Sequence, residues 1–140
     1  GFKNAAKGAD AAIVVTTPDV SAIRDADRII GMLDAMDIRE HKLIINRIRM
    51  DMVQRGEMLS VEDIKEFLSI DLIGIIPYDE TIITSTNKGE PVVFDSSSLA
   101  GRAFKNVVAR INGEDVPFLE LDTDNSLLAK LKKLFGIKGK

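Results

Sequence analysis

The sequence has 140 residues, of which 45% are hydrophobic and 29% charged, and its formal net charge is -3. This length suits one domain with a buried core plus a tail, and the acidic balance disfavours a nucleic-acid-binding surface. The chain has no cysteine and a single histidine, His41, which excludes disulfides and thiolate metal sites and disfavours a histidine-built metal site. No apolar run approaches the roughly 18 residues of a membrane-spanning helix. We therefore expect a cytoplasmic protein that is soluble or peripheral to a membrane.

Three apolar runs of strand length occur along residues 1–113. They are Ala12–Thr16, Lys42–Asn46 and Asp71–Pro77. None alternates strictly between apolar and polar residues, which is typical of parallel strands covered on both faces, and we assign Ala12–Thr16 to a central strand. Because helical patterns separate the runs, the order predicts an α/β fold, a doubly wound and mostly parallel sheet with flanking helices.

Helical patterns surround these strands. Gly1–Ala9 has the pattern of the end of a helix. Thr17 is a candidate N-cap for a helix that runs to about Met36, because Pro18 suits the first helical position. The apolar stripe of that helix is predicted to consist of Val20, Ile23, Ala26, Ile30 and Leu33. Further helices are expected at residues 60–68, 79–88 and 98–111. The first would open on a capping box of Ser60 and Asp63 and bury Ile64, Phe67 and Leu68. The last would turn Leu99, Phe104, Val107, Val108 and Ile111 inward.

Three strands are few for a doubly wound sheet, since sheets usually have about four to six. The chain opens within a helical pattern, and no glycine-rich loop follows any of the strands. We therefore expect residues 1–113 to be the carboxyl-terminal portion of a larger domain. No catalytic set of side chains is visible, so the chain is expected to be inactive alone.

Ligands of open α/β sheets bind outside the carboxyl ends of the strands. Asn46 follows the second strand there and offers a paired donor and acceptor that match the edge of adenine, while the guanidinium of Arg47 can stack on a base. Pro77 would form a rigid wall. The alternative remains that Asn46 ends its strand by bonding to its own backbone, Arg47 is a solvated charge and Pro77 only stops a strand.

The last residues have an amphipathic pattern. An acidic, turn-rich linker is expected at 114–125 and a helix at 126–140. On a helical wheel the apolar residues of this helix fall within an arc of about 120°. The stripe consists of Leu127, Leu128, Leu131, Leu134 and Phe135, and the flanking lysines are Lys130, Lys132 and Lys133. This pattern is typical of a helix that lies on anionic lipid. The alternative is a helix docked on the chain's own core. One tail should bind weakly, and two tails in a dimer strongly.

Four segments occur in order along the chain: TTPDVSAIRDADRIIGML, LIINRIR, RGEMLSVEDIKEFLSIDLIGIIPYDETIITSTNKGEPVV and LLAKLKKLFG. Together they resemble the MinD family of septum-site-determining ATPases, which carry a deviant Walker A loop and are related to ParA. The resemblance covers the chain from Gly1 to Gly136. In that family the Walker A loop, the switch regions and the Walker B aspartate lie upstream of this starting point, so the ligands of phosphate and magnesium have no counterpart here.

The resemblance implies roles for individual residues. Asn46 and Arg47 would flank the adenine, and Pro77, Tyr78 and Asp79 would lie on its other side. The segment from Leu127 to Phe135 would bind the membrane. A surface for MinC and MinE would include Ser21, Arg24, Asp25 and Arg28.

The resemblance further implies an ATP- and Mg-dependent homodimer on the cytoplasmic face of the inner membrane. It would recruit a MinC-like division inhibitor and answer to a MinE-like or DivIVA-linked regulator, with anionic lipid and no nucleic acid among its partners. Two alternatives stay open: a MinD-like ATPase that sets flagellar number, and a non-catalytic interaction module with a lipid-binding tail. A DNA-partitioning ATPase is disfavoured by the acidic charge.

Overall fold

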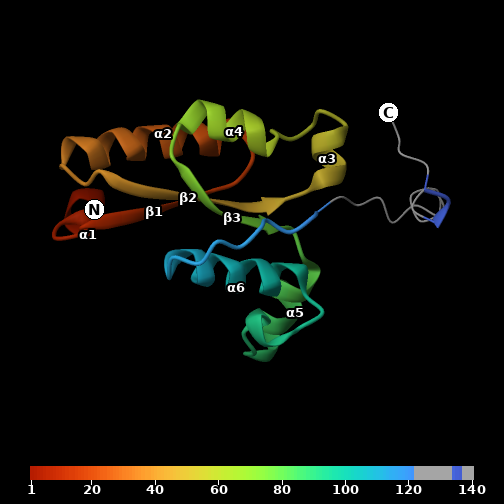
Figure 1. The fold of residues 1–140 in the computed structure, drawn as a ribbon. Helices are drawn as coiled ribbons and strands as arrows, with labels where there is room; N and C mark the ends of the chain where they lie inside the picture. Colours follow the sequence, from red (N-terminus) through yellow and green to blue (C-terminus); the bar gives the residue numbers. More distant parts are fainter. Residues whose placement is uncertain (122–133, 137–140) are drawn as a thin grey trace.

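A computed structural model of the chain describes residues 1–121 and 134–136. Its sheet contains β1 (Ala11–Thr16), β2 (Glu40–Ile48) and β3 (Asp71–Pro77), in the spatial order β1-β2-β3, with both pairs parallel (Figure 1). Each strand is linked to the next through helices. The predicted parallel α/β fold is therefore confirmed.

Helices cover both faces of the sheet. Two of them, α2 (Val20–Ala35) and α4 (Val61–Leu68), lie on one face, and α6 (Leu99–Ile111) lies on the other beneath β3 (Figure 1). The shorter elements are α1 (Phe2–Ala6), α3 (Met50–Gln54), α5 (Glu80–Lys88) and a 3-10 helix, η1 (Val92–Phe94). The part of the chain that the structure describes contains no helix that is both long and apolar enough to span a membrane.

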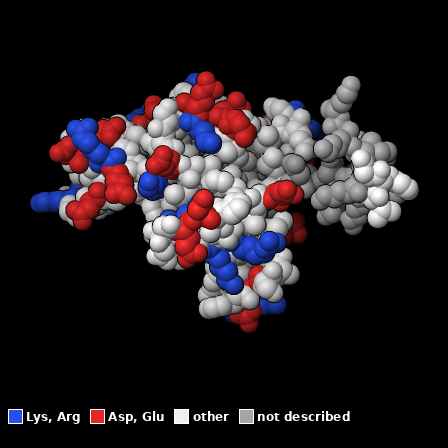
Figure 2. All heavy atoms as spheres, viewed as in Figure 1, with Lys and Arg blue, Asp and Glu red and all other residues white. Residues whose placement is uncertain are grey.

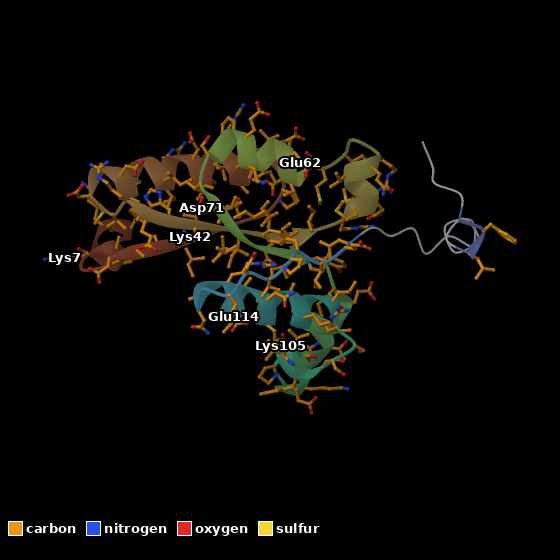
Figure 3. All side chains as sticks on the ribbon, in the orientation of Figure 1. Lys7, Lys42, Glu62, Asp71, Lys105 and Glu114 are labelled. Carbon is orange, nitrogen blue, oxygen red and sulfur yellow. The ribbon has the colours of Figure 1, made fainter. Side chains whose placement is uncertain are left out.

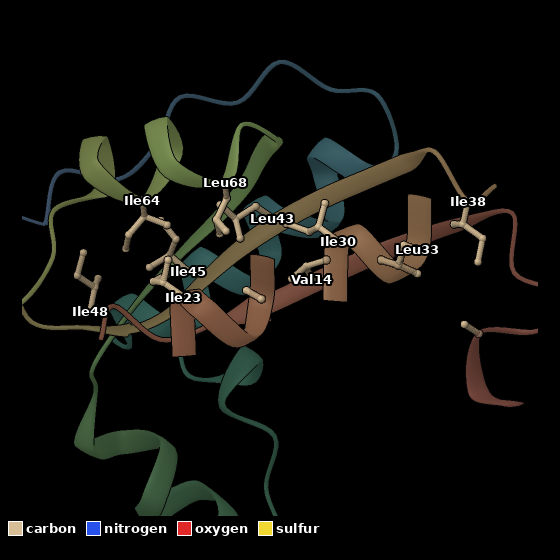
Figure 4. Close-up of a cluster of buried hydrophobic side chains, with 12 residues drawn as sticks. Val14, Ile23, Ile30, Leu33, Ile38, Leu43, Ile45, Ile48, Ile64 and Leu68 are labelled. Atoms are coloured by element: carbon tan, nitrogen blue, oxygen red, sulfur yellow. The ribbon is translucent and has the colours of Figure 1, made fainter. Parts of the chain in front are cut away.

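The larger of two apolar cores lies between the sheet and the α2/α4 layer. Leu43 and Ile45 of β2 are fully buried there and face Ile23 and Ile30 of α2 and Ile64 of α4 (Figure 4). Alternate residues of a strand point to the same face, so these side chains form one surface of the sheet. Burying them supplies most of the force that holds α2 and α4 on the sheet.

The smaller core lies between the other face and α6. Ile44, Ile73 and Ile76 pack there against α6. Gly74 permits close approach, because a Cβ at this position would lie 2.5 Å from Cγ2 of Val107. The interstrand ion pair of Lys42 and Asp71 (2.9 Å) joins β2 to β3 near their amino ends (Figure 3).

Several expectations about the first strand and helix are wrong. Among the described residues β1 pairs with β2 alone and is an edge strand. Ile13 and Val15 are 48% and 58% exposed rather than covered, because α6 packs against β3 and leaves this face of β1 open. The N-cap of α2 is Asp19, not Thr17, because the Asp19 carboxylate reaches the amide of Ala22 (3.0 Å). The helix starts two residues later than Pro18, and Val20 lies outside the buried stripe.

The inward face of α6 is narrower than predicted. Val107 is buried with Ala100 and Ala103, whereas Leu99, Val108 and Ile111 are exposed. Phe104 is partly buried and packs against the same core, so the helix buries a narrower apolar arc than predicted. Phe67 of α4, also expected in the core, is exposed as well.

The segment after α6, residues 114–121, lies against the body, and we refer to it as the strap. The Arg110 guanidinium donates to the carbonyls of Val116 (3.0 Å) and Pro117 (3.1 Å) in the strap and of Ile73 (2.9 Å) in β3. It also stacks 4.0 Å from the ring centroid of Phe118. Leu119 and Leu121 pack against the smaller and the larger core, respectively. The strap thus runs from α6 past β3 (Figure 1).

The predicted tail falls mostly outside the described residues. Leu127, Leu128, Lys130, Leu131, Lys132 and Lys133 lie there, while Leu134 and Phe135 are described and exposed. The amphipathic helix and the bounds of the linker and tail remain predictions. Over the face seen in Figure 2, acidic and basic side chains are interspersed rather than gathered by sign.

Candidate functional site

The carboxyl ends of the three strands lie at one edge of the sheet, since all are parallel. Ligands of open α/β sheets bind at this edge. Four polar or aromatic side chains follow the strand ends there: Asp19 after β1, Arg49 after β2, and Tyr78 and Asp79 after β3. The predicted base-binding residues Asn46, Arg47 and Pro77 belong to the strands themselves, because β2 continues to Ile48.

A β-bulge shapes the end of β2. Ile45 pairs with Ile75 and Ile48 pairs with Pro77, so Asn46 and Arg47 together oppose the single residue between them on β3. Arg47 adopts a left-handed backbone conformation with φ of 60°, which is uncommon for a residue with a side chain. The extra residue turns Arg47 to solvent and returns Ile48 to the larger core. Asn46 therefore does not end its strand, contrary to the alternative interpretation.

Three of the predicted base-binding residues line two separate hollows, and Arg47 and Pro77 line neither of these two. The half-buried Asn46 lines an open hollow beside α1, β1 and α2, with Thr16 and Thr17 nearby. Among the described residues, no hydrogen bond involves its side-chain amide. Tyr78 and Asp79 line a second hollow together with Arg49. The two sides are joined by the backbone, since the Tyr78 amide donates to the Ile48 carbonyl (2.9 Å).

Tyr78 and Arg49 form the outer wall of the second hollow. The Arg49 guanidinium lies 5.9 Å from the centroid of the Tyr78 ring and also pairs with Asp51 (2.8 Å). A guanidinium over an aromatic face is held by a cation–π attraction. The sequence analysis assigned no role to Arg49. Its place directly after the end of β2 is the signal that could have identified it. Pro77 is buried and serves as the floor of this turn.

Asp79 is the most highly bonded polar side chain of this edge. Its Oδ1 accepts from the Thr81 amide (2.9 Å) and lies 2.6 Å from the Thr81 hydroxyl, and its Oδ2 accepts from the Ser98 hydroxyl (2.6 Å) and the Ala100 amide (3.2 Å). Partial burial raises the pKa of Asp79, but these hydrogen bonds outweigh burial and lower it to about 2. The carboxylate is thus ionised at neutral pH.

Asp19 occupies the corresponding place after β1, but its bonds are local. Its carboxylate accepts from the hydroxyls of Thr17 and Ser21 and from the Ala22 amide. The Thr17 hydrogen bond, with that of the Ala22 amide, lowers the pKa of Asp19. This group caps α2 and reaches no other element.

The predicted partner surface on α2 is exposed. Ser21, Arg24, Asp25 and Arg28 all lie in solvent, and Arg28 is 3.8 Å from Asp25 in an ion pair one helical turn apart. An exposed pair of this kind contributes little stability, so these charges are available to a partner. Their role in binding stays a prediction.

The predicted base-binding residues include an amide, an arginine and a tyrosine, which are side chains that can contact a flat base. Asn46 and Tyr78 line separate hollows, and a role for them in binding one base stays a prediction. In residues 1–121 and 134–136, no group of three His, Cys, Asp or Glu side chains could hold a metal ion. We derive no step at phosphate or magnesium from these residues.

Comparison with known proteins identifies the family. Residues 4–112 match the family model described as "ParA: NUBPL iron-transfer P-loop NTPase". The chain is 51% identical to the septum site-determining protein MinD of Synechocystis over 135 residues, covering 95% of this chain and 51% of that protein. It is 45% identical to MinD of Bacillus subtilis over 140 residues, covering 99% of this chain and 52% of the relative.

Solved structures agree with the sequence comparison. The MinD cell division protein of Aquifex aeolicus superposes with a TM-score of 0.82 at 48% identity, covering 86% of this chain and 51% of that one. The MinC:MinD complex from the same organism gives a TM-score of 0.83 at 48% identity, with 86% and 50% covered. The chain thus spans about half the length of these relatives. It belongs to the ParA family of P-loop NTPases, within which its sequence and fold match those of septum-site-determining MinD proteins.

Proposed function

We propose that this chain is part of a dimerising, membrane-associated ATPase that places the cell-division site. The observation that carries the proposal is the identity of 45% to 51% with septum-site-determining MinD proteins along almost the whole chain. Because the chain spans about half of those proteins, hydrolysis belongs to the longer protein. The phosphate and magnesium ligands of that ATPase lie outside this chain.

The open edge of β1 supports a place within a larger sheet. Its outer side has no strand partner among the described residues, and the apolar Ile13 and Val15 beside it are exposed. Open, apolar strand edges invite pairing with another strand. A further strand of the longer ATPase would pair there and cover the hollow between α1, β1 and α2.

The nucleotide base would bind at the carboxyl edge of β2 and β3. Asn46 supplies a free amide to pair with adenine, Arg47 and Tyr78 supply flat surfaces, and Pro77 limits the turn. When bound with magnesium, ATP supplies the phosphoryl group that is hydrolysed. The residues of this chain only bind and orient the base.

The partners follow from the same relatives. A MinC-like inhibitor would bind the exposed face of α2 that carries Ser21, Arg24, Asp25 and Arg28, and the solved MinC:MinD complex of a relative supports this class of partner. A MinE-like or DivIVA-linked regulator would act on the same ATPase. Leu127 to Phe135 would attach the ATP-bound homodimer to anionic lipid on the cytoplasmic face of the inner membrane.

Co-sedimentation with vesicles of anionic lipid tests the proposal on the full-length protein that carries this chain. We expect sedimentation with ATP and little with ADP. The double variant Leu131→Asp, Phe135→Asp should lose it, because apolar burial is removed and charge repulsion added. Phe94→Asp, an equally drastic change at an exposed position of the body, is the matched control and should sediment normally. Sedimentation that ignores the nucleotide, or survives in the tail variant, contradicts the proposal.

Replacement of Asn46 tests the base site separately. Asn46→Ala should weaken ATP binding by roughly 1 to 3 kcal/mol, the range for losing paired hydrogen bonds to a base edge. Its melting temperature should change little because the amide bonds no other described residue. Calorimetric titration of the full-length protein measures the affinity, and an unchanged value would remove Asn46 from the site.

A further inference from the structure

Asp79 joins the first turns of two helices that are far apart in the sequence. It is the N-cap of α5 through the Thr81 amide, and it also accepts the amide of Ala100, 21 residues away, in the first turn of α6. The first amides of a helix have no partner within it. One carboxylate thus satisfies amides at both helix starts, where both helix dipoles favour negative charge.

Ser98 completes this junction from the α6 side. It is the N-cap of α6, accepting from the Gly101 amide (3.0 Å), and it donates its own proton to Asp79. Only 1% of Ser98 is exposed, so it cannot reach a ligand in solvent. The Thr81 hydroxyl lies within hydrogen-bond distance of both Asp79 and Ser98 (3.0 Å to the latter). The three side chains form one network between α5 and α6.

The acceptor capacity of Asp79 is filled by the protein itself. An ionised carboxylate has about four acceptor sites. The Thr81 amide, the Ser98 hydroxyl and the Ala100 amide take three of them, and the Thr81 hydroxyl, whose one proton can go to Asp79 or to Ser98, stands at the fourth. A nucleotide base could bond Asp79 only by displacing one of them. Binding of that kind would uncap a helix, which makes Asp79 a poor direct ligand.

The turn between β3 and α5 is therefore held from two sides. On one side the Tyr78 amide bonds to the Ile48 carbonyl at the end of β2. On the other, Asp79 is tied to α6 through Ser98 and Ala100. Tyr78, which lines the second hollow, and the buried Pro77 before it cannot shift unless one of these ties opens.

We propose that Asp79 is a positioning residue, which fixes the turn of Pro77 and Tyr78 by bridging the starts of α5 and α6 and does not itself bind the base. This inference rests on the proposed function, and it reassigns the contact with adenine that the resemblance implied for Asp79. The same network makes α6, which contains none of the predicted base-binding residues, part of the support of the base site.

A double-mutant cycle on the full-length protein distinguishes positioning from direct contact. Asp79→Ala and Ser98→Ala should each weaken ATP binding about tenfold, a change of about 1.4 kcal/mol. The double variant should be little worse than either, because both break one network. Affinity for inorganic tripolyphosphate, which has no base, should stay unchanged in all three. Wild-type ATP affinity in Ser98→Ala, beside a loss in Asp79→Ala, would overturn the inference in favour of direct contact.

Two controls keep the test decisive. Asp63→Ala removes the carboxylate of the capping box of α4, a helix that carries none of the predicted base-binding residues, and should lower the melting temperature without changing ATP affinity. If Asp79→Ala does not fold, Thr81→Val replaces it in the cycle, since it removes only one hydroxyl. An unmodified full-length protein that binds tripolyphosphate but not ATP overturns the inference. One that binds neither ligand refutes the proposed ATPase itself.

Discussion

The two outer edges of the sheet differ in how they are protected. The edge of β3 is crossed by the strap, which Arg110 fixes with three hydrogen bonds to backbone carbonyls, one of them in β3 itself. The edge of β1 has no cover of that kind in the described part of the chain, and the apolar side chains beside it are exposed. An unprotected strand edge is a site for pairing with another chain segment.

The two edges differ in whether the described part of the chain covers the outer strand. At β3 the chain bonds to its own edge through a charged side chain and packs Leu119 and Leu121, both partly buried, against the two cores. At β1 the α2/α4 layer covers one face of the strand. The other face is left uncovered because α6 lies under β3. The residues after the two strands repeat the contrast: Asp79 bridges two helices, whereas Asp19 caps one. Stability is thus expected to be concentrated on the β3 side.

The largest loss of stability is expected in β2, the central strand that pairs with both β1 and β3. Leu43 of β2 is fully buried between its neighbours, and Leu43→Ala should lower the free energy of unfolding by about 2 to 5 kcal/mol through lost burial and a cavity. Urea unfolding of this chain measures the loss. Leu43→Met nearly conserves volume and should cost less than about 1.5 kcal/mol. Equal losses in the two variants would contradict a packing effect.

Opening the closed edge should come next. Arg110→Ala should lower the free energy of unfolding by about 2 kcal/mol, because three carbonyls lose a charged donor and water replaces it only in part. Arg110→Lys keeps the charge but not the planar fork, and it should restore only part of the loss. Arg102→Ala, at an exposed position of the same helix, is the matched control. If Arg102→Ala destabilises as much as Arg110→Ala, the strap adds nothing to stability.

Acid should loosen the β3 side. The folded pKa of Asp79 is about 2 against an ordinary value of 3.8, so its contribution to stability is present above pH 4 and disappears as pH falls towards 2. Urea unfolding at pH 5 and at pH 2.5 measures this, and Asp79→Asn should show a smaller difference between the two pH values than the unmodified chain. Asp19→Asn, whose carboxylate has only local bonds, should change that difference less. The same pH dependence in Asp79→Asn and the unmodified chain would contradict the assignment.

The smallest effect is expected at the open edge. Val15→Thr keeps the β-branched shape and changes a side chain that is 58% exposed, so the free energy of unfolding of this chain should change by less than about 0.5 kcal/mol. In the full-length protein the same change should cost more than about 1 kcal/mol, because the rest of the proposed longer sheet and its helices would cover this face of β1 and bury the added hydroxyl. A difference of less than that between the two proteins would mean that β1 stays open in both.

The sequence predicted the fold class from local signals. Three apolar runs separated by helical patterns specify a parallel sheet, and the predicted strand ends were right within two residues, with β2 two residues longer at each end than predicted. The capping box of Ser60 and Asp63 was also readable, because both partners lie within one turn. The N-cap of α2 was predicted at Thr17 but is Asp19. Thr16, Thr17 and Asp19 are all capping residue types, and only the backbone conformation decides which of them caps the helix.

The candidate site was predictable as a location but not as an arrangement. The rule that ligands bind at the carboxyl ends of parallel strands directed attention to Asn46, Arg47 and Pro77. It could not reveal the bulge that keeps Asn46 and Arg47 inside β2, because a bulge depends on the register with β3. The adenine contact implied for Asp79 came from resemblance, which carries no information on the donors that surround it.

Composition and periodicity thus determined the elements of this protein and the order in which they occur. Tertiary structure decided which strand is an edge, where the strap lies, and that Asp79 bonds to residues 19 and 21 positions away. The physical reason is range: helix periods, caps and apolar runs act between neighbours in sequence. Edges, bulges and bridged helix starts arise only when distant segments are brought together.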